Sequence, residues 1–157
     1  MPAYRRHAPG RRRQGGAAAI EFALIFILFF VLFYAIVAYS LAMLLMQGFT
    51  QAAEEGARAA ISVNPIAFGS DADYAAGVEA AARGRATAAL SWLPGKAYQQ
   101  VIGGNNISAN LTGSVITVTV TYPNYSTNGL VPTLTIPLIG AVPRVPTNLV
   151  GEASLQI

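Results

Sequence analysis

A single carboxylate, Glu21, stands at the edge of a long apolar run and shortly after an arginine-rich segment. An ionisable group inside a membrane costs about 2.5–3.5 kcal/mol at the bilayer centre and less near the interface, so it needs a partner. If the chain were cut after Gly16, Ala17 would carry a new positive amine about one helical turn from Glu21. Glu21 would then pair with the amine of its own chain or of a neighbouring subunit. The alternative is that Glu21 reaches the lipid headgroups beside the arginines.

The segment that must position Glu21 is the apolar run of residues 22–46. It is about 25 residues long, or roughly 37 Å as an α-helix, whereas a bilayer core needs about 20 residues. We therefore predict a transmembrane helix at 22–46, with Tyr39 near the far interface. The arginines before it stay on the cytoplasmic side, which places the C-terminal part outside the cytoplasm. A cleaved secretory signal is the alternative, but its apolar region would be only about 7–15 residues long.

The composition agrees with a membrane protein. Hydrophobic residues make up 54% of the chain and charged residues 11%, whereas soluble domains have about a quarter charged residues. Half of the ten basic residues belong to the N-terminal segment, and they are Arg5, Arg6, Arg11, Arg12 and Arg13. The rest of the chain is mildly acidic, so we expect no nucleic-acid partner, because a nucleic-acid binder spreads basic residues over a folded face.

The residue inventory also argues against an enzyme. The chain has no cysteine, which excludes disulfides and cysteine-ligated metals. Its one histidine, His7, lies in the basic N-terminal segment, and no base accompanies the many serines and threonines. We therefore predict no catalytic residues, no cofactor, no metal site and no small-molecule substrate.

Helical character continues beyond the membrane segment. Ala52, Gly56 and Ala60 recur every four residues, which builds a narrow groove of small side chains where another helix can approach closely. The alternative is an ordinary alanine-rich helix. We expect this helix to end near Asn64, because Pro65 disfavours helical geometry in the residue before it.

A second helix is predicted at about residues 71–92. Ser70 provides an N-cap, and acidic residues occupy the first turn. Pro94 and Gly95 end the helix. One apolar stripe follows it at spacings of three and four, formed by Ala75, Val78, Ala82, Ala86, Ala89 and Leu93.

The remainder of the chain predicts strands. Residues 107–111 alternate in polarity, a turn follows at 112–114, and residues 115–122 (VITVTVTY) give the strongest strand pattern. Together they predict a β-hairpin. Residues 133–136 predict a short strand within a proline-rich loop, and residues 149–157 a further strand.

We therefore expect an α+β protein with a long transmembrane helix, a second amphipathic helix and a small antiparallel sheet of about three strands. The predicted organisation is a basic leader at 1–16, a long helix at 17–64 and an extracytoplasmic α+β domain at 65–157.

Two motifs resemble a known family. After the basic leader the chain has Gly16, then Ala-Ala-Ala-Ile, then Glu21-Phe22, and about thirty residues later Ala52-Ala53-Glu54-Glu55-Gly56-Ala57-Arg58. The first pattern is similar to that of prepilins, and the two together resemble TadE/TadG-like pseudopilins of the tight-adherence (Flp, type IV-like) pilus system. The resemblance is specific over residues 11–60 and weak beyond them.

The resemblance implies cleavage between Gly16 and Ala17 by a membrane prepilin peptidase, and a bacterial inner-membrane location. It implies a charge pair that involves Glu21 beside Phe22, and assembly through the N-terminal helix with other pilin-like subunits and the pilus assembly machinery. The chain is longer than a major Flp pilin, so the implied role is that of a minor pilin-like component. The competing hypothesis is a permanently anchored extracytoplasmic binding or sensor module.

Overall fold

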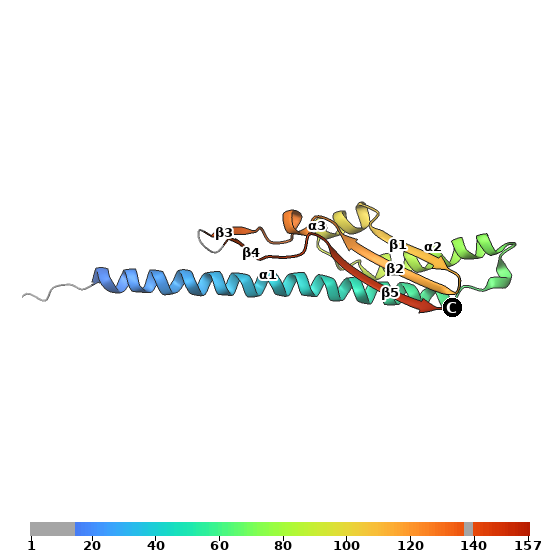
Figure 1. Cartoon of the computed structure of the whole chain (residues 1–157), viewed down its shortest axis with the longest axis horizontal. Helices are drawn as coiled ribbons and strands as arrows, with labels where there is room; N and C mark the ends of the chain where they lie inside the picture. The colour runs from blue at the N-terminus through green and yellow to red at the C-terminus, as the bar shows by residue number, and fades with distance from the viewer. Residues whose placement is uncertain (1–14, 137–139) are drawn as a thin grey trace, which may run out of the picture. The chain divides into compact units, whose positions relative to one another are not determined.

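The structure is a computed structural model that describes residues 15–136 and 140–157, and it confirms the α+β class (Figure 1). The predicted leader lies outside the described residues except for Gly15 and Gly16. In chain order the elements are α1 (Gly15–Ile61), η1 (Pro65–Ala67), α2 (Asp71–Ala89), α3 (Gly95–Tyr98), the π-helical turn η2 (Gln99–Gly103), β1 (Ile107–Thr112), β2 (Val115–Tyr122), α4 (Tyr125–Asn128), β3 (Leu134–Ile136), β4 (Gly140–Val142) and β5 (Leu149–Gln156).

The chain forms two compact units that divide inside α1, between Ile36 and Val37. In the first unit the apolar side chains of α1 face outward, and those of Phe22 and Leu28 are 68% and 72% exposed. By length and composition, α1 is able to cross a membrane. The second unit contains the rest of α1, the other helices and both sheets. The predicted boundary between the long helix and the extracytoplasmic domain, at residue 64, stays a prediction. By packing, the second half of α1 belongs to the same compact unit as the rest of the domain.

The core of the second unit lies between α1, α2 and the inner face of a three-stranded sheet. On α1 the buried residues include Leu45, Phe49 and Ala53, and on α2 they are Val78, Ala82 and Ala86. Alanine dominates both helix faces, so the two backbones approach each other closely. The predicted α2 stripe is confirmed at these three positions and at Leu93, while Ala75 and Ala89 are half-buried.

Both long helices end earlier than the sequence predicts. α1 ends at Ile61 rather than near Asn64, because Ser62 and Val63 form tighter turns onto the carbonyls of Ala59 and Ala60. Asn64 is extended, as expected before a proline, and its side chain caps η1 by accepting a hydrogen bond from the Ile66 amide.

α2 begins as predicted, with the Ser70 hydroxyl accepting a hydrogen bond from the Asp73 amide. It ends at Ala89 rather than Trp92, because Leu90 donates to the carbonyl of Thr87 and tightens the last turn. Leu90 and Leu93 stay buried beyond this point. The short elements α3 and η2, which the sequence analysis did not predict, follow Pro94.

The predicted hairpin is confirmed, and β5 completes a three-stranded antiparallel sheet in the order β1-β2-β5. Gly113 provides the positive φ that the tight turn between β1 and β2 needs. Along β2 the inward-facing residues are all buried, and they are Ile116, Val118, Val120 and Tyr122. At the outer edge of β1, the Leu111 amide donates to a Glu79 carboxylate oxygen of α2 at 2.9 Å. This contact occupies one donor of the edge strand.

The second sheet has two strands, β3 and β4. The strand predicted at 133–136 is confirmed as Leu134–Ile136. Its partner β4 was predicted to be loop, because it lies between prolines and is only three residues long. Gly140 begins β4 with a φ of 91°, a conformation that favours glycine. The pair extends beyond the end of the three-stranded sheet (Figure 1).

Two tyrosines close the core at the start of this extension. The rings of Tyr122 and Tyr125 meet edge to face at 5.1 Å, and the Tyr122 hydroxyl donates to the Asn128 carbonyl at 2.7 Å. Burial raises the pKa of both hydroxyls above the ordinary value. They therefore stay neutral hydrogen-bonding groups across the physiological pH range.

The approach of β5 to α1 leads to a stability prediction. A Cβ on Gly151 would overlap the backbone of Phe49 and Thr50, which cannot move without displacing α1. Gly151→Ala should therefore lower the free energy of unfolding by about 1–3 kcal/mol. Denaturant unfolding of the full chain in detergent measures the change.

The matched control is Gly84→Ala on the exposed face of α2, where no described atom lies within 4 Å of the new Cβ. This variant should gain about 0.5–1 kcal/mol, because alanine is the better helix former. Equal stability of the two variants would contradict the close packing of β5 on α1.

Candidate functional site

The predicted processing and charge-pair residues lie at the start of α1. Gly16 and Ala17 are in its first turn, Glu21 and Phe22 follow in the next, and all four are exposed. Ala17 and Glu21 share a face of the helix because they are four residues apart. Within the part of the chain that the structure describes, no ion pair involves Glu21. The arrangement leaves its carboxylate open to a partner.

Gly16 has no packing reason to be glycine. No described atom lies within 4 Å of the position that a Cβ would take, and the residue is in ordinary helical conformation. The fold therefore tolerates alanine at this position. Packing within the described residues therefore gives no reason for glycine at this position.

Phe22 begins a row of stacked aromatic rings on one face of α1. It stacks on Phe26 at 5.9 Å, Phe26 on Phe30 at 6.3 Å, and Phe30 on Tyr34 at 6.4 Å. The spacing of four residues aligns the rings along the helix. The row is exposed over most of its length, so it offers an aromatic surface to lipid or to another helix.

The small residues Ala52, Gly56 and Ala60 are all buried. A Cβ on Gly56 would lie 2.7 Å from the carbonyl oxygen of Ala82 and 3.1 Å from the Cβ of Ala86. The helix that approaches this stripe is therefore α2 of the same chain. Assembly with other subunits through these residues stays a prediction, and in this structure the stripe holds the domain on α1.

Two ion pairs flank Gly56 on α1. Arg85 of α2 contacts Glu55 at 2.6 Å, and Arg58 contacts Glu54 at 3.3 Å one turn away. The first pair joins the two helices beside the small-residue stripe, whereas the second lies within α1 and is exposed. In the segment 52–58, α1 thus approaches α2 closely at Gly56 and is linked to it by the ion pair of Glu55.

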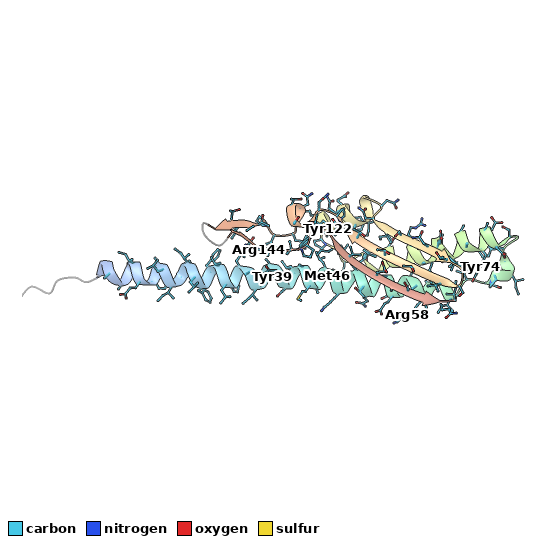
Figure 2. All side chains as sticks on the ribbon, viewed as in Figure 1. Tyr39, Met46, Arg58, Tyr74, Tyr122 and Arg144 are labelled. Carbon is cyan, nitrogen blue, oxygen red and sulfur yellow. The ribbon has the colours of Figure 1, made fainter. Side chains whose placement is uncertain are left out.

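A contact that the sequence did not predict joins distant parts of the chain. The Tyr39 hydroxyl accepts a hydrogen bond from the Arg144 amide at 2.9 Å and lies 3.4 Å from the Arg144 carbonyl oxygen, to which it donates (Figure 2). The signal available in the sequence is the hydroxyl of Tyr39 on an otherwise apolar helix face, because a covered tyrosine hydroxyl usually needs a hydrogen-bond partner. Nothing in the sequence indicated that a loop 105 residues later supplies it.

A second missed contact places Trp92 on Gly48. A Cβ at Gly48 would overlap the indole ring, so the glycine makes room for it. Leu44, Gln47 and Gln51 complete a groove of about 330 Å³ beside the ring. Among residues 15–136 and 140–157, no group of three His, Asp or Glu side chains is arranged to hold a metal ion.

Comparison with known proteins identifies a family for part of the chain. Residues 16–58 match the model of the TadE-like protein family. The matched segment begins at Gly16 and ends at Arg58, so it contains both motifs singled out in the sequence, and all of it lies on α1. The resemblance is thereby confirmed over these residues. No curated protein and no solved structure matches the chain.

The geometry of the segment 52–58 predicts that its glycine stabilises the fold more than its charges do. Gly56→Ala should lower the free energy of unfolding by about 1–3 kcal/mol through overlap with α2. The Glu55–Arg85 pair has side chains 28% and 57% exposed, so its coupling energy should be about 0.2–1 kcal/mol.

A double-mutant cycle of Glu55→Gln and Arg85→Gln measures the coupling, and denaturant unfolding measures the glycine variant. If the coupling energy of the ion pair exceeded the loss of unfolding free energy caused by Gly56→Ala, the prediction that the glycine contributes more than the charges would be wrong.

Proposed function

We propose that this chain, TadE-like over residues 16–58, is a minor pilin-like component of a tight-adherence, type IV-like pilus assembly. A prepilin peptidase cleaves it after Gly16. It resides in the bacterial inner membrane as a single-pass protein, with residues 1–16 in the cytoplasm and the C-terminal domain outside. The mature chain assembles with other pilin-like subunits through the N-terminal half of α1.

The observation that carries this proposal is the change in side-chain exposure along α1. In residues 16–30 the apolar side chains are exposed and Val31, Tyr34 and Ala35 are half-buried, whereas from Ala38 onward one face of the helix is buried. A helix that presents apolar side chains at one end and a folded domain at the other suits a subunit that packs by its N-terminal helix. The apolar half is also compatible with a permanently anchored binding or sensor module. Whether the chain is cleaved after Gly16 therefore distinguishes that hypothesis from the pilin-like one.

Charge chemistry supports the cleavage site. Cleavage after Gly16 removes all five N-terminal arginines and creates an amine on Ala17, on the face of α1 that carries Glu21. The exposed carboxylate then gains an opposite charge in an apolar setting, where unpaired charge is costly. In an assembly the amine of one subunit is able to neutralise Glu21 of the next.

Orientation follows from the same arginines. Clustered arginines next to a transmembrane helix remain in the cytoplasm. The domain therefore lies on the far side of the membrane, where it meets the other parts of the assembly. A body of this size beyond the helix supports a minor role rather than that of the major filament subunit.

Substitution of Gly16 tests the processing step. Gly16→Ala should leave the heavier, unprocessed chain in the membrane, because the peptidase rather than the fold requires glycine. Gly10→Ala in the leader is the control and should be processed normally. Intact mass of the membrane-extracted protein distinguishes the forms, and normal cleavage of Gly16→Ala would refute the assignment.

Substitution of Glu21 tests the assembly step separately. Glu21→Gln keeps the size of the side chain and removes its charge, so the chain should be cut normally but should co-purify poorly with other pilin-like subunits. Glu21→Asp keeps the charge and should retain part of the assembly. Unchanged co-purification of Glu21→Gln would mean that the charge pair has no role.

A further inference from the structure

The two edges of the three-stranded sheet are covered differently. Strand β1 forms one edge and β5 the other, with β2 between them. At the β1 edge, helix α2 packs alongside and Glu79 accepts a hydrogen bond from the Leu111 amide. At the β5 edge, no further strand is paired in the described part of the chain. An unpaired strand edge is a template on which another chain can add a strand.

The hydrogen bonds along β5 show which of its backbone groups point away from the sheet. The Ile157 amide donates to the carbonyl oxygen of Ser114, next to the start of β2, at 2.7 Å, so residue 157 directs its amide toward β2. In an antiparallel ladder this direction alternates from one residue to the next. The outward groups of β5 therefore belong to Val150, Glu152, Ser154 and Gln156. Among the described residues, none accepts a hydrogen bond from these four amides.

The same alternation accounts for the β1 edge. The Thr121 amide donates to the Asn106 carbonyl oxygen at 2.9 Å, so residue 106 directs this group toward β2. Leu111 lies at an odd separation from residue 106 and therefore points its amide away from β2. That amide is the one that Glu79 binds. Within the described chain, the sheet thus has an occupied outward donor at one edge and unoccupied outward donors at the other.

A groove runs beside the outward edge of β5, where the strand lies next to the C-terminal part of α1 (Figure 1). Its volume is about 430 Å³. The lining residues are Glu54, Ala57 and Arg58 on α1, and Glu152, Ala153, Ser154 and Leu155 on β5. All of them belong to the second compact unit, so the groove lies within one packed body. The outward amides of Glu152 and Ser154 therefore border an open space.

The shape and lining of this groove suit an extended segment of polypeptide. Neighbouring strands lie about 4.8 Å apart, so an added strand would be in hydrogen-bonding distance of the outward groups of β5. Side chains alternate between the two faces of such a strand, and one set would point toward the groove lining. The apolar part of that lining consists of Ala57, which is buried, and Ala153 and Leu155, which are half-buried.

The charges of the groove favour a basic residue in the added strand. Glu54 is paired with Arg58 at 3.3 Å, whereas Glu152 makes no ion pair among the described residues. The one described contact of the Glu152 carboxylate is the Thr119 hydroxyl, which donates to it at 3.2 Å. Opposite charges on neighbouring strands stabilise their pairing, and like charges directly opposite each other destabilise it. A lysine or arginine beside Glu152 would therefore stabilise an added strand.

A second copy of this chain lacks the complementary edge. Strand β5 contains no lysine or arginine, so pairing of β5 with β5 would bring two copies of Glu152 together without a cation from either strand. Pairing of β5 with β1 of another copy would meet helix α2 and the Glu79 contact that already cover that edge. The occupant that fits is therefore a segment of a different protein.

We propose that the outward edge of β5 binds an extended segment of a partner protein, which adds a fourth strand to the sheet and places a lysine or arginine beside Glu152. The apolar side chains of this segment contact Ala57 and Leu155 at alternate positions. The inference goes beyond the proposed function, because it assigns a binding edge to the folded domain. It does not depend on cleavage after Gly16 or on the charge of Glu21.

A synthetic peptide tests this edge directly. The probe is a short fluorescein-labelled peptide of alternating valine and threonine with one central arginine, and the full chain is kept in detergent. Fluorescence anisotropy measures the dissociation constant. A matched peptide carries glutamate in place of arginine and should bind at least about tenfold more weakly, because its charge repels Glu152. If the arginine peptide does not bind the wild-type chain, the proposal is wrong.

Substitutions of Ser154 locate the peptide on the edge. Ser154→Pro removes an outward amide and keeps the bonds to β2, as edge strands allow, so it should weaken binding at least about tenfold. Ser154→Ala is the matched control. It loses the hydroxyl contact with Thr117 but keeps the amide, so the dissociation constant should change less than about twofold. Denaturant unfolding checks that both variants are folded, and equal binding by two folded variants would exclude strand addition at β5.

Exchange of the charges tests the role of Glu152 and does not require a proline in the strand. Glu152→Lys should reverse the preference, so that the glutamate peptide binds more tightly than the arginine peptide. Glu152→Gln should bind the two peptides about equally. If Glu152→Lys still prefers the arginine peptide, the recognition of a basic residue by Glu152 is refuted.

Discussion

The helix α1 is exposed and apolar in its first part and packed against its own domain in its second part, and the packing of the other elements depends on this difference. The first turns of α1, residues 16–30, are exposed and apolar apart from Glu21, whereas the second half is apolar or small on one face only, where α2 and the sheet cover it. Large side chains such as Phe49 fit on parts of the covered face, but at two positions a side chain would overlap the backbone of a neighbouring element. These positions are Gly56 on α1, which lies against Ala82 of α2, and Gly151 on β5, which lies against Phe49 and Thr50 of α1.

The close approach at Gly56 gives a structural reason for the part of the family match that lies beyond the apolar run. The match runs through residue 58, well past the apolar run. Its last part contains Gly56, which makes room for α2, and Glu55, which pairs with Arg85. The second motif, residues 52–58, therefore contains residues that attach the domain to α1. The first motif, at Gly16 and Glu21, has no such packing role in the described chain and is better explained by chemistry with other molecules.

The sequence predicted the elements whose patterns are local. The long helix, the start of the helix at Asp71, the hairpin 107–122 and the strand at 149 all follow from periodicity, caps and turn residues, although the long helix was predicted to reach residue 64 and ends at Ile61. It failed where tertiary contacts decide. β4 is three residues long and depends on pairing with β3, and the Tyr39–Arg144 contact joins segments 105 residues apart. The stripe at Ala52, Gly56 and Ala60 predicted a close helix contact, but the identity of the helix, α2 of the same chain, is not encoded in the spacing.

The account depends most on the chemical identity of the mature N-terminus. Mass spectrometry of the wild-type protein, extracted from the membranes of the cells that make it, reads that terminus directly. The account predicts a chain that starts at Ala17 with a free amine. A chain that still begins at Met1 or Pro2 would contradict it and would leave a permanently anchored domain in place of a pilin-like subunit.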